Sequence, residues 1–437
     1  MNIRNECYNI LKAADEDNAF VGEVLGNALR RLQFSDKRDR AFLTKLTEGV
    51  VERRISLDYL IDKFSKKAPD ADTRIILQMG IYQIRYMESV PDRAAISESV
   101  ELCKEVGLDG RSGYVNALLR KVATLKEEKK LDSLLVSKMD VRYSTPKWIC
   151  DLLVSSYGKD NAKLILEDQF KEHDTVIRVN SLKTTVEELK ERLTEKGVTV
   201  KDGILSKRTL RISNYDSITR LPGFRDGHFI VQDETSVYAI EHAGIKPGDK
   251  ILDMCAAPGG KSLLAYELAT AEDKAALVTS CDISDSKLEK IRENAERLGI
   301  PCGDGDIPAG IKLSERDATE LIELEVGKYD VVISDVPCSG LGVMGRKNDI
   351  KYNVTAESAA SLAEQGLKIL KNASYYVNQT GTIIFSTCTI NPKENEEVVR
   401  TFLEEEECKN FEIADERTFL QGIDGSDGFY FCIIKKR

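Results

Sequence analysis

The chain has 437 residues, of which 42% are hydrophobic and 31% charged, and its formal net charge is −10. This length and composition are typical of a soluble protein with about two to four domains. No apolar run approaches the roughly 18 residues that a membrane-spanning helix needs, and the first residues lack the apolar core of a signal peptide. We therefore expect a cytoplasmic protein without a membrane segment.

Cysteine, histidine and charge distribution add three expectations. The ten cysteines contain no C-x-x-C pair, which favours reduced thiols. The three histidines lie far apart in the sequence, so we expect no metal site. Nothing implies an oligomer, and we expect a monomer. Because the acidic excess lies in residues 221–437, any bound RNA should be held mainly by residues 1–220.

Residues 1–138 are predicted to form a helical bundle, because apolar residues recur at three- and four-residue spacing. Asp72 is a candidate N-cap and Gly107 a candidate helix end. The segment resembles the NusB-like RNA-binding helical domain in the runs 39–42, 57–61, 79–84, 90–102 and 114–120. The resemblance implies a bundle that docks RNA or protein and has no catalytic role. We interpret the basic cluster at residues 30–40 first as solvated surface.

Residues 139–225 are predicted to form a small α+β module. The run 175–180 alternates like a strand, residues 186–197 make a capped amphipathic helix, and further short strands follow. The pattern around Arg178 and Asn180 is similar to the substrate-side module of RNA cytosine-C5 methyltransferases. Contact with RNA and a structural surface pair remain equally open for these two residues.

Residues 226–437 alternate between strand and helix patterns, which is typical of a mostly parallel, doubly wound sheet of Rossmann-like class. We expect a loop at residues 302–308 and a helix beginning at Asn391-Pro392. The expected strands are 250–254, 276–282, 311–316, 329–335, 381–387 and 429–434.

A glycine-bearing loop between the first of these strands and the next helix is a candidate cofactor site. A P-loop would need glycine at position 255, which is Cys255. A dinucleotide loop needs G-x-G-x-x-G, but this loop offers only Gly259 and Gly260. A smaller adenosine cofactor fits better, with Asp282 positioned for ribose hydroxyls and Asp317 for adenine. Taken singly, both aspartates are more simply explained as helix caps.

Cys338 and Cys388 each follow a strand that should end at the same sheet edge as the loop. Ligands of open α/β sheets bind beyond the carboxyl ends of the strands. A lone cysteine there is usually a small buried hydrophobe, but two thiols beside Asp335 favour chemistry. A thiolate with a lowered pKa is a strong nucleophile and suits attack on an electron-poor ring carbon.

Together these motifs resemble the S-adenosylmethionine-dependent RNA cytosine-C5 methyltransferases. The resemblance spans nearly the whole chain and rests on the runs 231–236 (VQDETS), 253–261 (DMCAAPGGK), 335–340 (DVPCSG), 386–392 (STCTINP) and 394–396 (ENE). With the NusB-like front segment it implies a class I methyltransferase in residues 226–437 and small-subunit rRNA as substrate.

The resemblance also implies a role for each residue. Cys388 would add to cytosine C6, Asp335 would hydrogen-bond the N3 edge of the base, and Cys338 would assist release of the product. Arg346 and Lys347 would contact backbone phosphate. S-adenosyl-L-methionine would be held by Cys255, Ala256, Ala257, Pro258, Gly259, Gly260, Lys261, Asp282, Asp317 and Asp335.

Three departures from the family pattern fall around the expected base pocket. Val336 stands in place of alanine, Leu341 in place of threonine and Asn348 in place of proline. They leave the reaction type intact but bear on substrate geometry. Two other functions remain open: the same reaction on tRNA, and a non-catalytic RNA-binding assembly factor.

Overall fold

The computed structural model describes residues 2–17, 19–32, 36–136, 138–270 and 276–437. Contacts group the chain into two compact units, Met1–Phe170 with Met344–Val354 and Lys171–Val343 with Thr355–Arg437. The expected division at residues 138 and 225 stays a prediction. Residues 139–170, which we assigned to the middle module, are largely helical and group with the first unit.

The first unit is helical in the part of the chain that the structure describes. Its helices are α1 (Ile3–Asp17), α2 (Val21–Arg31), α3 (Lys37–Glu52), α4 (Arg54–Phe64), α5 (Ala71–Tyr86), α6 (Asp92–Glu105), α7 (Ser112–Glu127), α8 (Met139–Arg142), α9 (Lys147–Asp168) and α14 (Ile350–Asn353). Apolar faces of α1 to α8 share one core, which includes Leu46, Leu60 and Leu119, and Tyr352 of α14 packs against it. At Gly49 of α3 an added Cβ would lie 1.9 Å from the Tyr82 ring of α5, so only glycine permits this close approach.

The N-terminus of α5 corrects one predicted cap. Asp70, and not Asp72, is the N-cap residue, and its Oδ1 accepts a hydrogen bond of 2.8 Å from the backbone N–H of Thr73. Asp72 lies inside the helix and accepts a hydrogen bond from the hydroxyl of Tyr8 instead. Gly107 has a φ of 78° directly after the C-cap of α6, as predicted for a helix end.

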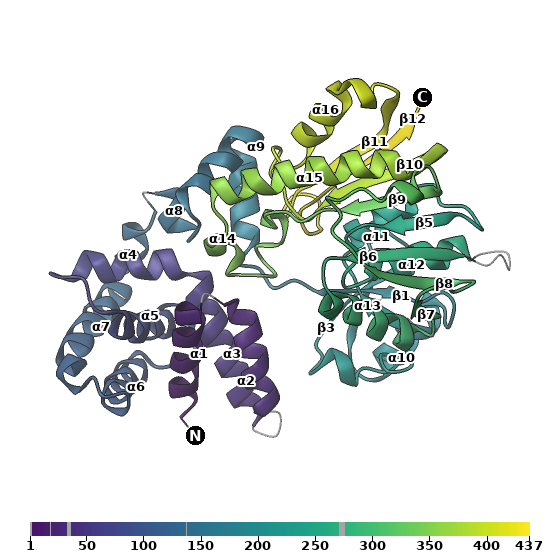
Figure 1. Cartoon of the computed structure of the whole chain (residues 1–437). Helices are drawn as coiled ribbons and strands as arrows, with labels where there is room; N and C mark the ends of the chain where they lie inside the picture. The colour runs from purple at the N-terminus through teal and green to yellow at the C-terminus, as the bar shows by residue number, and fades with distance from the viewer. Residues whose placement is uncertain (1, 18, 33–35, 137, 271–275) are drawn as a thin grey trace. The chain divides into compact units, whose positions relative to one another are not determined.

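The second unit contains two sheets (Figure 1). The smaller has the order β2-β3-β1-β4 and is antiparallel at every pairing, and α10 (Val186–Glu195) packs its apolar side chains on one face. Its strands are β1 (Thr175–Val179), β2 (Thr199–Asp202), β3 (Thr209–Ser213) and β4 (Phe229–Val231).

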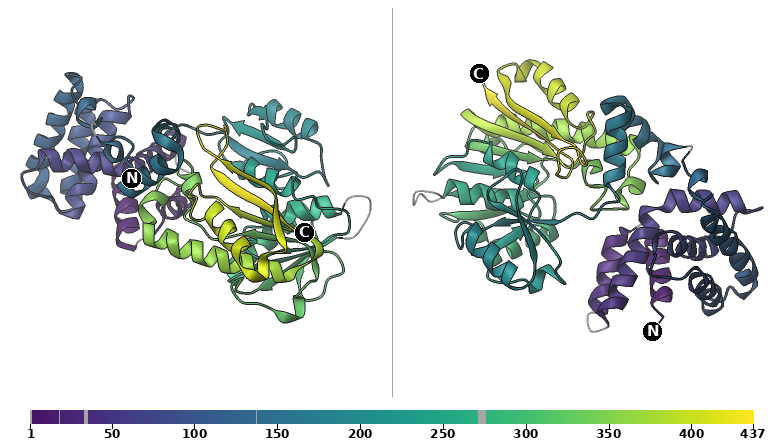
Figure 2. Two further views of the ribbon diagram at one scale, coloured as in Figure 1. Left: turned by 90° about the horizontal axis from the view of Figure 1, so that it is seen from above. Right: turned by 180° about the vertical axis from the view of Figure 1, so that it is seen from behind.

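The larger sheet has the order β11-β12-β10-β9-β5-β6-β8-β7. All pairings from β10 to β7 are parallel, whereas β12 and β11 pair antiparallel at one edge, where the yellow C-terminal strands lie beside β10 (Figure 2). Its strands are β5 (Lys250–Asp253), β6 (Leu277–Asp282), β7 (Cys302–Asp304), β8 (Gly310–Glu315), β9 (Tyr329–Asp335), β10 (Val377–Thr387), β11 (Phe411–Phe419) and β12 (Phe429–Lys436).

Helices cover both faces of the larger sheet. α11 (Glu234–Glu241), α12 (Gly260–Ala269) and α13 (Asp285–Leu298) pack on one face, and α15 (Ala356–Tyr376) and α16 (Glu396–Glu404) on the other. Alternate strand residues therefore face two apolar cores: Val331 and Ile333 of β9 face one, and Val332 the other. The predicted fold class, a helical bundle, a small α+β module and a mostly parallel doubly wound sheet, is confirmed. Within the described ranges, no helix has the length and apolar character needed to cross a bilayer.

Three local expectations were wrong. Residues 302–304, expected in a loop, pair with β8 as a short edge strand. The strand β11 was missed, because its exposed residues from Glu412 to Glu416 do not alternate in polarity like a half-buried strand. Finally, α16 begins at Glu396 and not at Pro392, because Glu394 and Asn395 lie in a preceding turn.

Arg178 and Asn180 are fully buried, so both expected roles, contact with RNA and a surface pair, are wrong. Arg178 donates from Nε to Gln232 Oε1 at 2.8 Å and forms an ion pair with Glu267 of α12, and neither side chain of that pair is exposed. Asn180 donates to the carbonyls of Gly227 and Leu298. Both residues therefore join the smaller sheet to the helices of the larger one.

Replacing Arg178 by methionine should strongly destabilise the second unit. The change leaves the carboxylate of Glu267 buried without its counter-ion, which costs about 3–5 kcal/mol. Guanidinium unfolding followed by circular dichroism measures the loss. Arg220→Met, which removes an exposed partner of Asp216, is the matched control. Because Glu267→Gln removes the stranded charge, the double variant should regain part of the loss; equal midpoints for Arg178→Met and the control would contradict the prediction.

Candidate active site

The turn between β5 and α12 brings backbone groups to the carboxyl edge of the larger sheet. The N–H of Met254 donates to Ile333 O of β9 at 2.9 Å, and that of Ala256 donates to Cys281 O of β6 at 2.8 Å. Gly259 adopts a φ of 102° at the N-cap of α12, which a residue with a side chain rarely adopts. The turn is thus fixed to both neighbouring strands and leads into a helix N-terminus, where free N–H groups and the helix dipole favour a polar ligand.

Asp253 ends β5 and is fully buried. Its Oδ2 accepts a hydrogen bond of 2.6 Å from Ser262 Oγ, whereas its Oδ1 has no hydrogen-bond partner. Burial raises the pKa of this carboxyl from 3.8 to about 7. An unpartnered buried oxygen of this kind is an acceptor available to a ligand.

Asp282 and Asp317 occupy different surroundings. Asp282 ends β6, accepts a hydrogen bond from Ala257 N at 3.0 Å and forms an ion pair with Lys287. It therefore lies against the loop, as the cofactor hypothesis requires. Asp317 follows β8 and accepts a hydrogen bond from Thr319 N at 2.8 Å, which lowers its pKa. This bond closes a turn and no helix begins there, so the expected helix-cap role of Asp317 is wrong. The adenine contact stays a prediction.

Asp335, at the end of β9, joins the loop to a third strand. Its Oδ2 accepts a hydrogen bond from Lys261 Nζ at 2.7 Å, and its Oδ1 accepts one from Ser386 Oγ of β10 at 2.7 Å. Burial alone would lower the pKa of Lys261, but the charge of Asp335 and this hydrogen bond outweigh it and raise the pKa. The ammonium thus stays charged, and it also interacts electrostatically with Cys388.

The two candidate thiols lie side by side. Sγ of Cys338 is 3.4 Å from Sγ of Cys388, and both cysteines are reduced. The pKa of Cys338 is raised well above its ordinary value, first by its hydrogen bond to Cys388 and then by burial. This shift favours the protonated form of Cys338. The sequence predicted the two cysteines at one sheet edge, and the structure brings them into contact.

Glu394 ties the two cysteine loops together. This carboxylate is 2% exposed and accepts hydrogen bonds from Ser339 N at 2.7 Å, from Ser339 Oγ at 2.5 Å and from Asn391 Nδ2 at 2.8 Å. Ser339, which follows Cys338, also bonds Thr389, which follows Cys388. We identified Glu394 only as part of a motif, because its partner lies 55 residues earlier in the chain and local pattern does not reveal it.

The departures from the family pattern do not all lie at one place. Val336 is 5% exposed and packs into the core under α15, and Leu341 is fully buried, with its carbonyl accepting a hydrogen bond from Gln421. Asn348 belongs to the segment that groups with the first unit. Val336 and Leu341 therefore affect packing behind the cysteine loops. Elsewhere in the described ranges, no cluster of histidine, cysteine and carboxylate side chains could hold a metal ion.

Comparison with known proteins assigns the family. The profile of the 16S rRNA methyltransferase RsmB/F family matches residues 243–430, that of the NusB family residues 1–124, and that of the RsmF/B-like ferredoxin-like domain residues 145–219. Over 99% of both chains, the sequence is 32% identical to "Probable ribosomal RNA small subunit methyltransferase B" of Synechocystis. The chain belongs to the RsmB/F family of 16S rRNA methyltransferases. The Bacillus subtilis relative of the same name is 30% identical over 100% of this chain and 99% of its own length.

Solved structures share the fold of this RsmB/F protein. The crystal structure of PH0851 superposes with a TM-score of 0.80, covering 100% of this chain and 99% of that one at 20% identity. A methyltransferase homologue from Pyrococcus horikoshii gives a TM-score of 0.58 at 24% identity, covering 68% of this chain and 97% of its own. The predicted NusB-like front segment and methyltransferase family are confirmed.

The RsmB/F family uses S-adenosyl-L-methionine as methyl donor, and the residues of the loop fit this cofactor. The unpartnered Oδ1 of Asp253 faces no protein donor. Carboxylates at the ends of β5, β6 and β9 complement a cofactor that carries a positive sulfonium and a positive ammonium group.

Cofactor binding should strengthen as pH rises through about 7, because Asp253 has a pKa of about 7. Below this pH its carboxyl is neutral, and above it the ionised form attracts the cationic cofactor. Calorimetric titration with S-adenosyl-L-methionine between pH 6 and pH 8 should give a falling dissociation constant, and Asp253→Asn should flatten the change. Asp249→Asn, before the opposite end of β5, is the control. A slope that survives in Asp253→Asn would refute this assignment.

Proposed function

We propose that the protein transfers the methyl group of S-adenosyl-L-methionine to C5 of a cytosine in small-subunit rRNA, through a covalent adduct between Cys388 and C6. The observation that supports this chemistry best is the pair of thiols 3.4 Å apart beside Asp335. C5 of cytosine is a poor nucleophile until a thiol saturates the 5,6 bond. A site with one attacking thiol and a second thiol beside it meets that need.

The two thiols have different surroundings, which supports different roles. Contact with Cys388 and burial raise the pKa of Cys338, and the Lys261 ammonium favours negative charge on Cys388. In the reaction, the Cys388 sulfur bonds to C6, and C5 takes the methyl group as its bond to the donor sulfur breaks. C5 then gives its proton to solvent water, and the electron pair of that C–H bond restores the 5,6 double bond as the S–C6 bond breaks and its electron pair returns to the Cys388 sulfur. Cys338 assists this release.

Asp335 and Lys261 position the base and the nucleophile. The Asp335 carboxylate is held on both oxygens, by Lys261 and Ser386, so its orientation is fixed before substrate binds. Its remaining lone pairs can accept hydrogen bonds at the N3 edge of the cytosine, from the N4 amino group and from N3 once that nitrogen is protonated in the adduct. Fixed polar groups of this kind stabilise charge without reorganising during the reaction. The bound cofactor supplies an electrophilic methyl group, which the loop at residues 255–261 with Asp282 and Asp317 would present to C5.

The proposed substrate is an unpaired or extruded base, because a stacked cytosine cannot expose C6 to a thiol. The Synechocystis and Bacillus subtilis relatives are named as small-subunit rRNA methyltransferases, which favours rRNA over tRNA. We place the reaction in the cytoplasm, where small-subunit rRNA is assembled. A non-catalytic assembly factor is the second candidate. Two contacts argue against it: the two cysteines lie against each other, and Asp335 pairs with Lys261.

Replacing each cysteine by alanine tests the proposed mechanism. Cys388→Ala should abolish methyl transfer to a small-subunit rRNA transcript and form no adduct, because the attacking sulfur is gone. Cys338→Ala should accumulate a denaturant-stable protein–RNA adduct, because release fails. The measurement is radiolabel in RNA from methyl-labelled cofactor, with gel analysis of the adduct.

The control is Cys408→Ala, a buried cysteine outside the pair. Exchanged behaviour of Cys338→Ala and Cys388→Ala would keep the reaction and reverse the roles. If wild-type protein labels tRNA and not rRNA, the substrate is wrong. If it labels no RNA while binding cofactor, the assembly-factor function replaces the enzyme.

Glu394→Gln should lower the rate of methyl transfer by about tenfold to a hundredfold, because glutamine brings an N–H₂ donor against the Ser339 and Asn391 donors and displaces the cysteine loops. Binding of S-adenosyl-L-methionine, measured by calorimetry, should not change, since Glu394 does not contact the cofactor loop. The control is Glu404→Gln, on the last turn of α16. Loss of cofactor binding in Glu394→Gln would indicate general unfolding and contradict this role.

A further inference from the structure

The turn between β11 and β12, residues 420–428, is hydrogen-bonded to the loop that carries Cys338, and both segments belong to the second unit. The N–H of Gly428 donates to Gly342 O at 2.8 Å. The N–H of Gly342 donates in turn to the carbonyl of Cys388 at 3.0 Å. One residue of the Cys338 loop therefore connects the β11–β12 turn to the backbone of the other cysteine.

Gly342 and Gly428 approach each other more closely than two residues with side chains could. An added Cβ at Gly342 would lie 2.0 Å from Gly428 O, and one at Gly428 would lie 2.7 Å from Gly342 Cα. A side chain at either position would force the two backbones apart. The β11–β12 turn and the Cys338 loop are thus in direct backbone contact, with no space to absorb a displacement.

Gln421 of the β11–β12 turn holds the same loop through its side chain. It is 5% exposed, and its Nε2 donates to the carbonyl of Leu341 at 3.0 Å. Its Oε1 is buried and accepts no hydrogen bond from the described residues. Burial of an amide with one end unpaired costs free energy. A contribution to stability is therefore a poor explanation for a glutamine at this position.

The strands on either side of the turn support the Cys388 side chain. Phe419 at the end of β11 and Phe429 and Phe431 of β12 belong to one buried apolar cluster, and Cys388 packs against it. The Phe429 ring also lies beside the Lys261 ammonium, with the nitrogen 5.4 Å from the ring centroid. The turn is therefore continuous with residues that contact one candidate thiol and the charged amine of the site.

The β11–β12 turn and Glu394 hold different parts of the Cys338 loop. Glu394 accepts hydrogen bonds from Ser339, whereas the turn bonds Leu341 and Gly342. The short segment that begins at Cys338 is thus held at both of its ends. Loss of either set of bonds would leave one end free to move.

We propose that Gln421 is a positioning residue for methyl transfer, which holds the Cys338 loop so that the two thiols meet. The inference rests on the proposed function for its catalytic consequence, whereas the contact of the thiols can be measured without it. Misplacement of a reacting group by about 1 Å can lower a rate by about a hundredfold. One side-chain hydrogen bond at this loop is therefore enough to affect the reaction.

The test replaces Gln421 by methionine, which has a similar length and no amide. The variant should lower kcat for methyl transfer to a small-subunit rRNA transcript by about tenfold. KM for S-adenosyl-L-methionine should not change, because the lost bond does not involve the cofactor loop. The midpoint of guanidinium unfolding should change little, because methionine removes the unpaired oxygen together with the bond. A residue that only stabilised the fold would lower the midpoint instead.

A second measurement reports the contact of the thiols directly. Diamide takes one hydrogen from each of two thiols and joins their sulfurs as a disulfide. Peptide mapping by mass spectrometry should show the link between Cys338 and Cys388 forming about fivefold more slowly in Gln421→Met than in wild type, because the two sulfurs must meet to form the bond. No link in wild type, or equal rates in wild type and variant, would overturn the inference.

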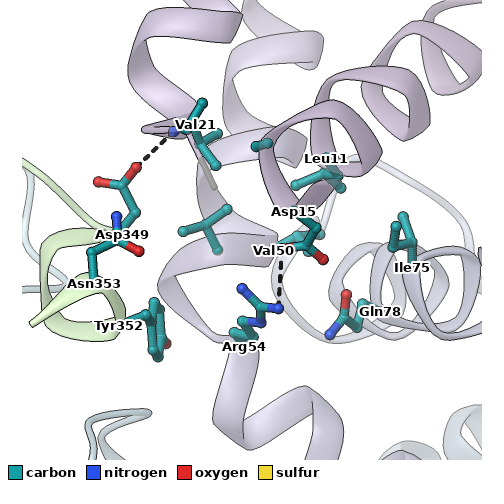
Figure 3. A pocket seen from close by; sticks show the side chains of 13 residues that line it. Leu11, Asp15, Val21, Val50, Arg54, Ile75, Gln78, Asp349, Tyr352 and Asn353 are labelled. Atoms are coloured by element: carbon teal, nitrogen blue, oxygen red, sulfur yellow. Dashed lines mark hydrogen bonds and ion pairs between the residues drawn. The ribbon is translucent and has the colours of Figure 1, made fainter. Parts of the chain in front are cut away.

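Gln78→Met is the matched control. Gln78 is 6% exposed, its Nε2 donates to Asp58 Oδ1 at 2.9 Å, and it lines a cavity of about 330 Å³ in the first unit (Figure 3). It thus loses a buried amide and one side-chain hydrogen bond, as Gln421→Met does. Gln78→Met should leave kcat and the rate of disulfide formation at their wild-type values.

The two measurements separate this inference from the proposed function. If wild-type protein transfers no methyl group, the proposed function fails, but slower disulfide formation in Gln421→Met would still support the positioning role. An unchanged kcat in Gln421→Met with active wild type would overturn that role. Gly428→Ala, whose Cβ would displace Gly342, should show the same two losses and keeps the test valid if Gln421→Met does not fold.

Discussion

The hydrogen-bonded ion pair of Lys261 and Asp335 is the interaction on which the candidate active site depends. It joins the loop after β5 to the end of β9, and the hydroxyl of Ser386 adds the end of β10. These three strands are neighbours in the sheet, and the chain reverses its direction of winding between β5 and β9. Open α/β sheets bind ligands at such a switch point. This ion pair therefore holds the cofactor loop against the ends of the two strands that lead into the cysteine loops.

The titratable groups around this ion pair have pKa values that are shifted by different causes. Asp253 is buried deeply enough for its pKa to rise to about 7, whereas Lys261 keeps its proton because Asp335 lies beside it. The pKa of Cys338 is raised by its contact with Cys388 and by burial. Burial and partner charge thus shift the pKa values of neighbouring groups in one site by different causes.

Features encoded by short sequence patterns could be predicted, and features built from long-range contacts could not. The six expected strands all exist within a few residues of their predicted bounds, because strands that are buried on both faces are nearly continuous apolar runs. The cofactor loop and both cysteines could be predicted because each comes directly after the end of a predicted strand. By contrast, β11 is mostly exposed, and Arg178 looks like a surface residue until Glu267 of a later helix lies against it. Glu394 likewise accepts a hydrogen bond from Ser339, which lies 55 residues earlier.

The buried bonds of Arg178 and Asn180 bear on how such chains can change over evolution. The ion pair of Arg178 spans residues 178 to 267, and Asn180 bonds carbonyls of Gly227 and Leu298. A chain that lost the small antiparallel sheet would leave a carboxylate of α12 without its counter-ion in an apolar interior. The small sheet therefore cannot be lost or replaced alone, because α12, which it contacts through this ion pair, would have to change at the same time. We expect both parts to be inherited together.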